Sequence, residues 1–262
     1  MQPPIENGKS VILYHRSYRK LPGSVQLFLL QFVCMAVPLA ALTAYNYPKL
    51  THAICLLAET ILSPFYAHDT VMITQGPFLA AVGYLNFLNV PGKYPTFGFS
   101  IVNFAISLVL LLFLVYFCKP RPLNICLIPI VTVHMLASCF FAVSPNLFPY
   151  DTADYSYLYM VQQISILLFV PFIMGVALLP LPSGTMTKFL TMIATYLYSL
   201  TFGTVRYVAI LYFLSKASLL YMALLFFAFG PLLDFAYIVG IYSIHVTWLA
   251  KKIKGDFSLW RW

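Results

Sequence analysis

The sequence has very few charged residues. Only 8% of its 262 residues are Asp, Glu, Lys or Arg, whereas a typical soluble domain carries about 25%. Such a composition excludes an ordinary water-exposed surface. Hydrophobic residues make up 61% of the chain, and apolar runs of about 20 residues, the length that crosses a bilayer, recur from residue 25 almost to the C-terminus. The sequence therefore predicts an integral multi-pass membrane protein in contact with the lipid bilayer.

The apolar runs lack the alternation of polar and apolar residues that is typical of a transmembrane β-barrel. The runs 106–117 and 219–229, for example, do not alternate. We therefore predict an all-α, polytopic helical protein with about eight spans. The expected spans are 25–45, 50–66, 71–90, 97–117, 123–144, 157–180, 188–214 and 218–247.

The second and third of these spans are the weakest. Pro64, Asp69 and Gly76 are among the residues that interrupt them, and both runs are short. The alternative is that residues 50–90 form a re-entrant hairpin, which leaves six spans. Both versions have an even number of spans and place the two termini on the same side.

The basic residues are distributed unevenly about these spans. Eleven of the 15 Lys and Arg residues fall on the side of the two termini, and the outer loops carry only Lys49, Lys93 and Lys216. Because cytoplasmic loops are enriched in Lys and Arg, both termini are predicted to be cytoplasmic. A retained first span is favoured over a cleaved signal peptide because the 24-residue polar leader is long. The expected organisation is a basic N-terminal segment (1–24), a transmembrane bundle (25–248) and a basic, aromatic interfacial tail (249–262).

Clustered metal ligands and catalytic motifs are also lacking. The five cysteines form no CxxC pair, and the five histidines lie on different segments. No HExxH, GxSxG or P-loop pattern is present. We expect no metal and no cofactor. We also expect no nucleic-acid partner, because the basic residues lie at the chain ends and in short loops.

Several polar residues nevertheless fall inside the predicted spans. Glu59, His134 and Arg206 each lie about 12 to 15 Å below the outer surface on a helical rise of about 1.5 Å per residue. Because ionisable groups avoid lipid, we expect an outward-facing pocket in which Arg206 pairs with Glu59 and His134 lies nearby. The alternative is a buried ion pair that only fixes helix packing. Further polar residues in the same half of the bundle are Asn86, Asn103, Gln162 and Gln163.

A second polar set occurs in the last span. Asp234, Tyr237 and His245 share one helix face, which suggests a proton path, or alternatively a hydrogen-bonded Asp234 that packs against a neighbouring helix. If the last two spans close at Lys216, Asp234 lies about 12 Å deeper than the residue facing Arg206. We therefore expect Arg206 to belong with Glu59 and His134 rather than with Asp234.

One catalytic arrangement is represented by Cys139, Arg206 and His245. The chain resembles exosortases and archaeosortases, multi-span membrane transpeptidases, in this Cys, Arg, His order and in span count alone. The resemblance implies a catalytic thiol at Cys139. The context Ser138-Cys139-Phe140 lacks the glycine-containing signature. His245 also lies near the inner face, and His134 has the better depth for a base that must reach the thiol.

Three functions follow from these features. The favoured one is a non-catalytic membrane subunit or carrier whose pocket binds a small or lipid-linked anionic group, or stabilises a larger membrane complex. The second is an outer-face thiol enzyme that uses Cys139, His134 and Arg206. The third is a purely structural subunit that assembles with other membrane proteins.

Overall fold

The computed structural model describes residues 25–67, 70–79, 83–117 and 122–252. The predicted N-terminal segment and most of the predicted interfacial tail lie outside these ranges. The elements are α1 (Val25–Leu62), η2 (Ser63–Phe65), β1 (Met72–Pro77), β2 (Tyr84–Asn89), α2 (Phe97–Tyr116), α3 (Pro122–Val143), η3 (Pro145–Leu147), α4 (Thr152–Leu178), α5 (Thr185–Lys216), η4 (Leu219–Tyr221), α6 (Met222–Phe229) and α7 (Pro231–Lys252).

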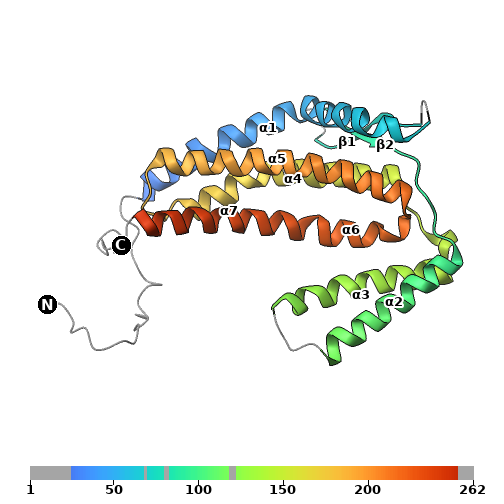
Figure 1. The fold of residues 1–262 in the computed structure, drawn as a ribbon. Helices are drawn as coiled ribbons and strands as arrows, with labels where there is room; N and C mark the ends of the chain where they lie inside the picture. The colour runs from blue at the N-terminus through green and yellow to red at the C-terminus, as the bar shows by residue number, and fades with distance from the viewer. Residues whose placement is uncertain (1–24, 68–69, 80–82, 118–121, 253–262) are drawn as a thin grey trace.

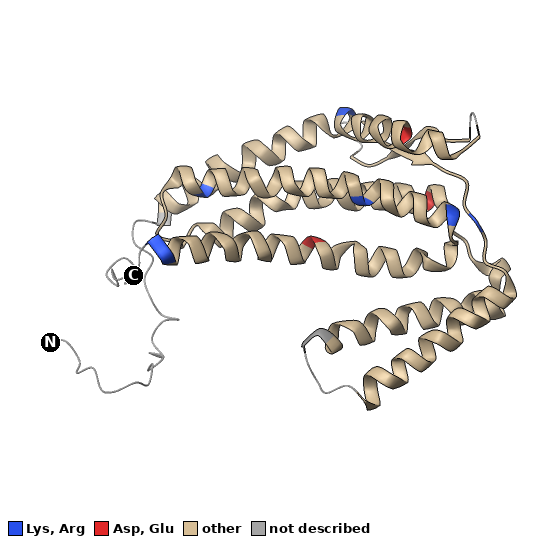
Figure 2. Ribbon diagram, viewed as in Figure 1, with Lys and Arg blue, Asp and Glu red and all other residues tan. Residues whose placement is uncertain are grey.

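The described chain is mostly helical. It contains six helices that are long and apolar enough to cross a membrane, with α6 and α7 together forming the last one. These helices indicate an integral multi-pass membrane protein. Figure 2 shows how few charged residues occur along them.

The first two predicted spans are wrong, because the structure has one helix over both. α1 continues through Pro48 for 38 residues. A proline removes only one backbone donor, and neighbouring polar groups can compensate inside a helix. Around Pro48, polar groups are paired within the protein, although neither contact replaces the lost bond to the Ala44 carbonyl oxygen: Asn46 donates to the carbonyl oxygen of Leu42 at 2.9 Å, and the carbonyl oxygen of Pro48 accepts from Asn86 Nδ2 at 2.9 Å. Asn46, Pro48 and Lys49 therefore resemble a loop in the sequence but lie within a continuous helix.

The third predicted span is also wrong: this segment is an antiparallel β-hairpin. β1 pairs with β2 in a register that places Met72 opposite Asn89 and Pro77 opposite Tyr84. The two strands bond to each other along one edge, the Asn86 and Leu88 N–H groups on the outer edge of β2 donate to the hydroxyls of Thr51 and Tyr207, and residues 85–88 are buried. The hairpin packs against α1 and α4. Apolar content alone predicted a helix here, but Gly76 and Pro77 favour strand ends and turns over a continuous helix.

Four helical segments form the main bundle. α1, α4, α5 and the α6–α7 segment lie side by side, with the start of α1 and the end of α7 at the same end (Figure 1). The β-hairpin and the α5–α6 turn lie at the opposite end (Figure 1). α4 contributes the most evenly buried helix, because residues along its whole length pack against α1 and α5.

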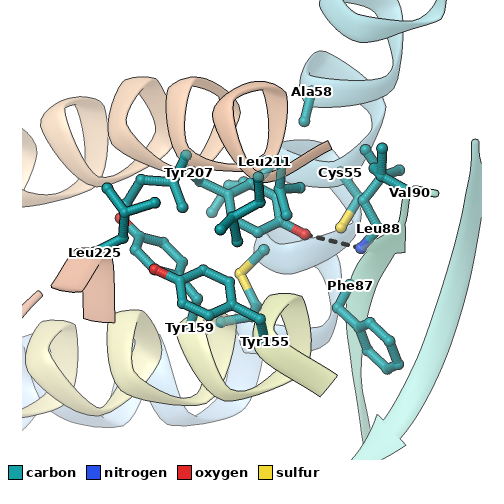
Figure 3. Packing of buried hydrophobic residues seen from close by; sticks show 14 of the residues in the cluster. Cys55, Ala58, Phe87, Leu88, Val90, Tyr155, Tyr159, Tyr207, Leu211 and Leu225 are labelled. Carbon is teal, nitrogen blue, oxygen red and sulfur yellow. Dashed lines mark hydrogen bonds between the residues drawn. The ribbon is translucent and has the colours of Figure 1, made fainter. Parts of the chain in front are cut away.

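The core near the β-hairpin contains a row of tyrosines. Tyr155 and Tyr159 of α4 lie beside Tyr207 of α5, with Leu88 of β2 and Cys55 of α1 close by (Figure 3). The Tyr207 hydroxyl accepts a hydrogen bond from the Leu88 backbone N–H at 2.8 Å and lies 2.6 Å from the Ser156 hydroxyl. Buried hydroxyls need such partners, and this one fixes the hairpin to the bundle.

The α2–α3 pair is built differently. It forms a helical hairpin beside the bundle (Figure 1), and α3 contacts the bundle through η4 and α6. In α2 only Ser100, Ser107 and Leu114 are buried. Beside this contact, an apolar groove of about 450 Å³ is lined by residues of α3, α6 and the start of α7. Most of the surface of this pair therefore faces away from the rest of the chain.

Candidate functional site

Arg206 is the centre of the most highly connected polar cluster in the described chain. Its side chain lies on α5 and is only about 5% exposed. The guanidinium group donates from Nε to the Tyr159 hydroxyl at 2.6 Å and from Nη1 to the Gly230 carbonyl oxygen at 3.2 Å. Nη2 donates to Gln163 Oε1 at 3.4 Å and to Asp234 Oδ2 at 3.0 Å. All three guanidinium nitrogens are thus engaged by protein groups.

The charge of Arg206 is balanced by Asp234. Nη2 lies 3.0 Å from Asp234 Oδ1 as well as from Oδ2, although only Oδ2 is aligned to accept a hydrogen bond. Gln162 Nε2 donates to the same Oδ2 at 3.3 Å. Asp234 is about 3% exposed. The pair is net neutral, which permits it to be buried among apolar helices.

The expected pairing of Arg206 with Glu59 is not what the structure has. Within the described residues, the salt bridge of Arg206 is to Asp234. The depth argument failed because the turn between the helices is longer than expected: α5 ends at Lys216, whereas α6 starts only at Met222. Arg206 lies about 15 Å from the end of α5, and Asp234 about 18 Å from the start of α6. The two residues therefore sit at nearly the same level.

A helix break brings the backbone into this cluster. α6 ends at Phe229 and α7 starts at Pro231, and the carbonyl oxygen of Gly230 between them accepts from Arg206 as well as from the Asp234 backbone N–H. A Cβ on Gly230 would lie 2.2 Å from the Phe226 carbonyl oxygen and 2.9 Å from Gln162 Nε2. Only glycine fits between these groups.

A second glycine allows α4 and α5 to approach each other. A Cβ on Gly203 would lie 2.2 Å from Gln163 Nε2, and Gln163 donates to the Ser199 carbonyl oxygen at 3.0 Å. The Gly203 carbonyl oxygen accepts from Tyr159 at 3.0 Å. The aromatic ring of Tyr159 also lies 5.2 Å from the Arg206 Cζ atom, a cation–π distance.

The three residues of the predicted proton path all face α5. Asp234 binds Arg206, Tyr237 donates to the Ser199 hydroxyl at 2.6 Å, and His245 Nδ1 lies 2.8 Å from the Thr191 hydroxyl. We call these contacts the α5–α7 seam. Along α7, Tyr237 and His245 are separated by about 12 Å, which is farther than one hydrogen bond reaches. Within the seam, each of the three side chains therefore has its own partner on α5.

His134 and Asn103 form a separate cluster. His134 Nε2 lies 3.4 Å from Asn103 Oδ1, which also accepts from the Tyr221 hydroxyl at 3.0 Å. The rings of His134 and Tyr221 stack with their centroids 5.0 Å apart. This cluster joins α2, α3 and η4, so His134 belongs to the attachment of the α2–α3 pair and does not contact Arg206.

The remaining predicted site residues lie apart from both clusters. Glu59 is half-buried on α1, and Cys139 is an exposed free thiol on α3. His245 is about 16 Å beyond Asp234 along α7, so the Cys139, Arg206, His245 set is not assembled. Among the residues that the structure describes, no group of three or more His, Cys, Asp or Glu side chains could hold a metal ion.

Some members of the Arg206 cluster were missed from the sequence. Tyr159, Ser199 and Gly203 are apolar or weakly polar residues that are common in membrane helices, so composition gave no signal. Their spacing does give a signal. Tyr159 is four residues before Gln163, and Gly203 is three residues before Arg206, so each pair lies on one helix face.

No protein-family model, curated protein or solved structure matches this chain. Its function is therefore argued from the geometry of these clusters.

Proposed function

We propose that this protein is a non-catalytic integral membrane subunit, in which the Arg206 cluster holds the bundle together and the α2–α3 pair contacts another membrane protein. The observation that carries the first part is the enclosure of Arg206. Its guanidinium group is engaged by Tyr159, Gln163, Asp234 and the Gly230 carbonyl oxygen, and the side chain is about 5% exposed. A site for an anionic substrate requires free donors and an access route. In this cluster, protein groups bind the donors of Arg206, and Asp234 balances its charge.

The second part is supported by the α2–α3 pair. Its helices are apolar and largely uncovered by the rest of the chain, and the groove beside α3 is lined by apolar residues of α3, α6 and α7. In a membrane, helices associate through close packing, because the hydrophobic effect does not drive them together in lipid. An apolar two-helix arm with a groove along one side is suited to packing against further helices.

The proposed topology has both termini in the cytoplasm. The start of α1 and the end of α7 lie at one end of the bundle (Figure 1), and Lys251 and Lys252 lie at that end of α7. Among the described residues, Lys188 near the start of α5 lies at this end as well. The positive-inside rule supports assigning this end to the cytoplasm.

The structural role of the Arg206 cluster is tested by removing both charges together. In the double variant Arg206→Met with Asp234→Leu, we expect folded protein to accumulate and partner proteins to co-purify in mild detergent, because apolar residues can replace a buried ion pair. A carrier or anion-binding protein would fold in this variant but lose its activity. Cys139→Ala, which removes the exposed thiol, serves as the test of the thiol enzyme and is expected to behave like the wild type.

The contact surface is tested by photo-crosslinking in the native membrane. A crosslinking residue at Val109 on α2 is compared with one at Val176 on α4, since the two valines are 67% and 63% exposed. We expect a protein adduct from position 109 and only lipid adducts from position 176. Lipid adducts alone at both positions would refute the docking role of the α2–α3 pair.

A further inference from the structure

A small cavity lies at the end of the bundle where α5 begins and α7 ends. Its volume is about 190 Å³, and its lining is Pro182, Ser183, Gly184, Thr187, Trp248, Leu249 and Lys252. This is smaller than the clefts of about 300 to 1,000 Å³ that hold drug-sized ligands. It is several times the volume of about 30 Å³ that one water molecule occupies in the liquid. The cavity therefore suits a single small polar group.

The surroundings of the cavity carry uncompensated positive charge. Lys252 lines the cavity, and its Nζ atom lies 5.3 Å from the centroid of the Trp248 ring. Lys188, one residue beyond the lining residue Thr187, is about 6% exposed, and its ammonium group donates to the Leu179 carbonyl oxygen at 2.7 Å. In the described part of the chain, neither lysine has a carboxylate partner. Lys252 is exposed and Lys188 is buried beside the lining, so an anion in the cavity is attracted by both charges and would supply the counter-ion that the described residues do not.

Neutral hydrogen-bond groups complete the lining. The Ser183 hydroxyl lies 3.3 Å from His245 Nε2, which fixes its position at the wall of the cavity, and the Thr187 hydroxyl lies on the adjacent turn of α5. The first turn of α5 has no acidic residue, and its N-cap residue Gly184 makes no side-chain capping bond. The backbone N–H groups of this turn add to the positive potential that the lysines create.

We propose that this cavity binds a phosphate group, either in the headgroup of an anionic phospholipid or in a soluble phosphate. A phosphate is an anion with several acceptor oxygens, which matches a lysine, hydroxyl groups and backbone N–H donors. Trp248 and the lysines beside it are typical of the membrane–water boundary, which favours the lipid source. A zwitterionic choline headgroup is disfavoured, because the described residues that line the cavity offer no carboxylate for the choline cation. This inference is independent of the proposed subunit function.

The test uses Trp248 as the reporter. In the full-length chain, Trp260→Phe and Trp262→Phe leave Trp248 as the single tryptophan. The protein is reconstituted in phosphatidylcholine vesicles, and its fluorescence quenching by brominated phosphatidylglycerol is compared with that by brominated phosphatidylcholine. We expect phosphatidylglycerol to be preferred. The variant Lys252→Gln is expected to reduce this preference about fivefold, on the basis of roughly 1 kcal/mol per basic residue at a membrane surface.

Lys251→Gln is the matched control, because Lys251 is adjacent, exposed and equally charged but does not line the cavity. It is expected to retain most of the preference. The proposal would be overturned if Lys251→Gln and Lys252→Gln lost the lipid preference equally, or if the single-tryptophan chain were quenched equally by the two lipids and also did not respond to inorganic phosphate. Inorganic phosphate is added to neutral vesicles as a second arm. If it changes Trp248 fluorescence in the single-tryptophan chain but not in its Lys252→Gln variant, while the two brominated lipids quench equally, the phosphate site stands and its ligand is soluble.

Discussion

The main bundle and the α2–α3 pair contrast in how their helices are held. In the bundle, polar side chains are buried at several levels and bond across helices, from Thr191 and His245 at one level to Arg206 and Asp234 at another. In the described part of the α2–α3 pair, a cross-helix polar cluster surrounds Asn103, and most of the exposed large side chains are apolar. Buried polar contacts specify a single arrangement of helices, whereas an apolar surface accepts lipid or another protein.

The largest effect is expected from removing one charge of the buried pair. Asp234→Ala leaves the Arg206 guanidinium buried without its counter-ion, which should destabilise the fold by about 3 to 5 kcal/mol. We expect the loss to appear as reduced accumulation and a lower thermal midpoint in detergent. Glu59→Gln is the control, since Glu59 is half-buried and forms no salt bridge within the described residues. A similar loss in both variants would show that the Arg206 cluster is not the stabilising contact.

Glycine substitutions compare the two regions directly. Gly203→Ala places a methyl group against the bonded Gln163 side chain, so it should destabilise the bundle by about 1 to 3 kcal/mol. Gly98→Ala, at a position of α2 with no atom within 4 Å of the added Cβ, should be neutral or stabilise by up to about 1 kcal/mol. Thermal midpoints of the two variants test this, and equal midpoints would contradict the close packing of α4 and α5.

A smaller effect is expected from Tyr207→Phe. This change removes the acceptor of the Leu88 backbone N–H and should destabilise the fold by about 1 to 2 kcal/mol, because a buried donor is left unpaired. Hydrogen exchange at the Leu88 amide should accelerate in this variant. Tyr212→Phe is the control, because Tyr212 is an exposed α5 residue. Unchanged protection of Leu88 would show that the β-hairpin does not depend on Tyr207.

The smallest effect on stability is expected from Tyr221→Phe. It removes the hydroxyl that donates to Asn103 at 3.0 Å, at an expected cost of about 0.5 to 1.5 kcal/mol. The measurable change is in geometry: spin labels on α2 and α5 should report a broader distance distribution. Labels on α4 and α5 should keep their distribution. Broadening of both pairs would mean that the α2–α3 pair is not attached independently.

Much of the helical architecture follows from the sequence. The predicted spans 97–117 and 123–144 agree closely with α2 and α3, because each is a continuous apolar run with Pro or Gly residues at its boundaries. α4 begins several residues before the predicted start at 157. The Asp151–Asp154 capping box, which determines this start, is visible in the sequence. Apolar composition identifies such helices reliably because lipid imposes their length.

The site was harder to predict because it depends on where the turns lie. A four-residue error in the start of α6 shifts the level of Asp234 by about 6 Å, which was enough to assign Arg206 to the wrong partner. The β-hairpin was missed for a related reason: an apolar count does not distinguish a buried strand from a short membrane helix. The separation of His134 from Arg206 depends on the attachment of the α2–α3 pair, which single-helix patterns do not encode.

The α5–α7 seam has a consequence for the order in which the chain enters the membrane. Arg206 is synthesised 28 residues before its counter-ion Asp234. During that interval, α5 alone would expose a cation to lipid, at a cost of about 2.5 to 3.5 kcal/mol at the bilayer centre. The insertion machinery is therefore expected to retain α5 until α7 emerges and to release the two helices together. Truncation of the nascent chain before Asp234 should leave α5 accessible to carbonate extraction, whereas truncation after α7 should not.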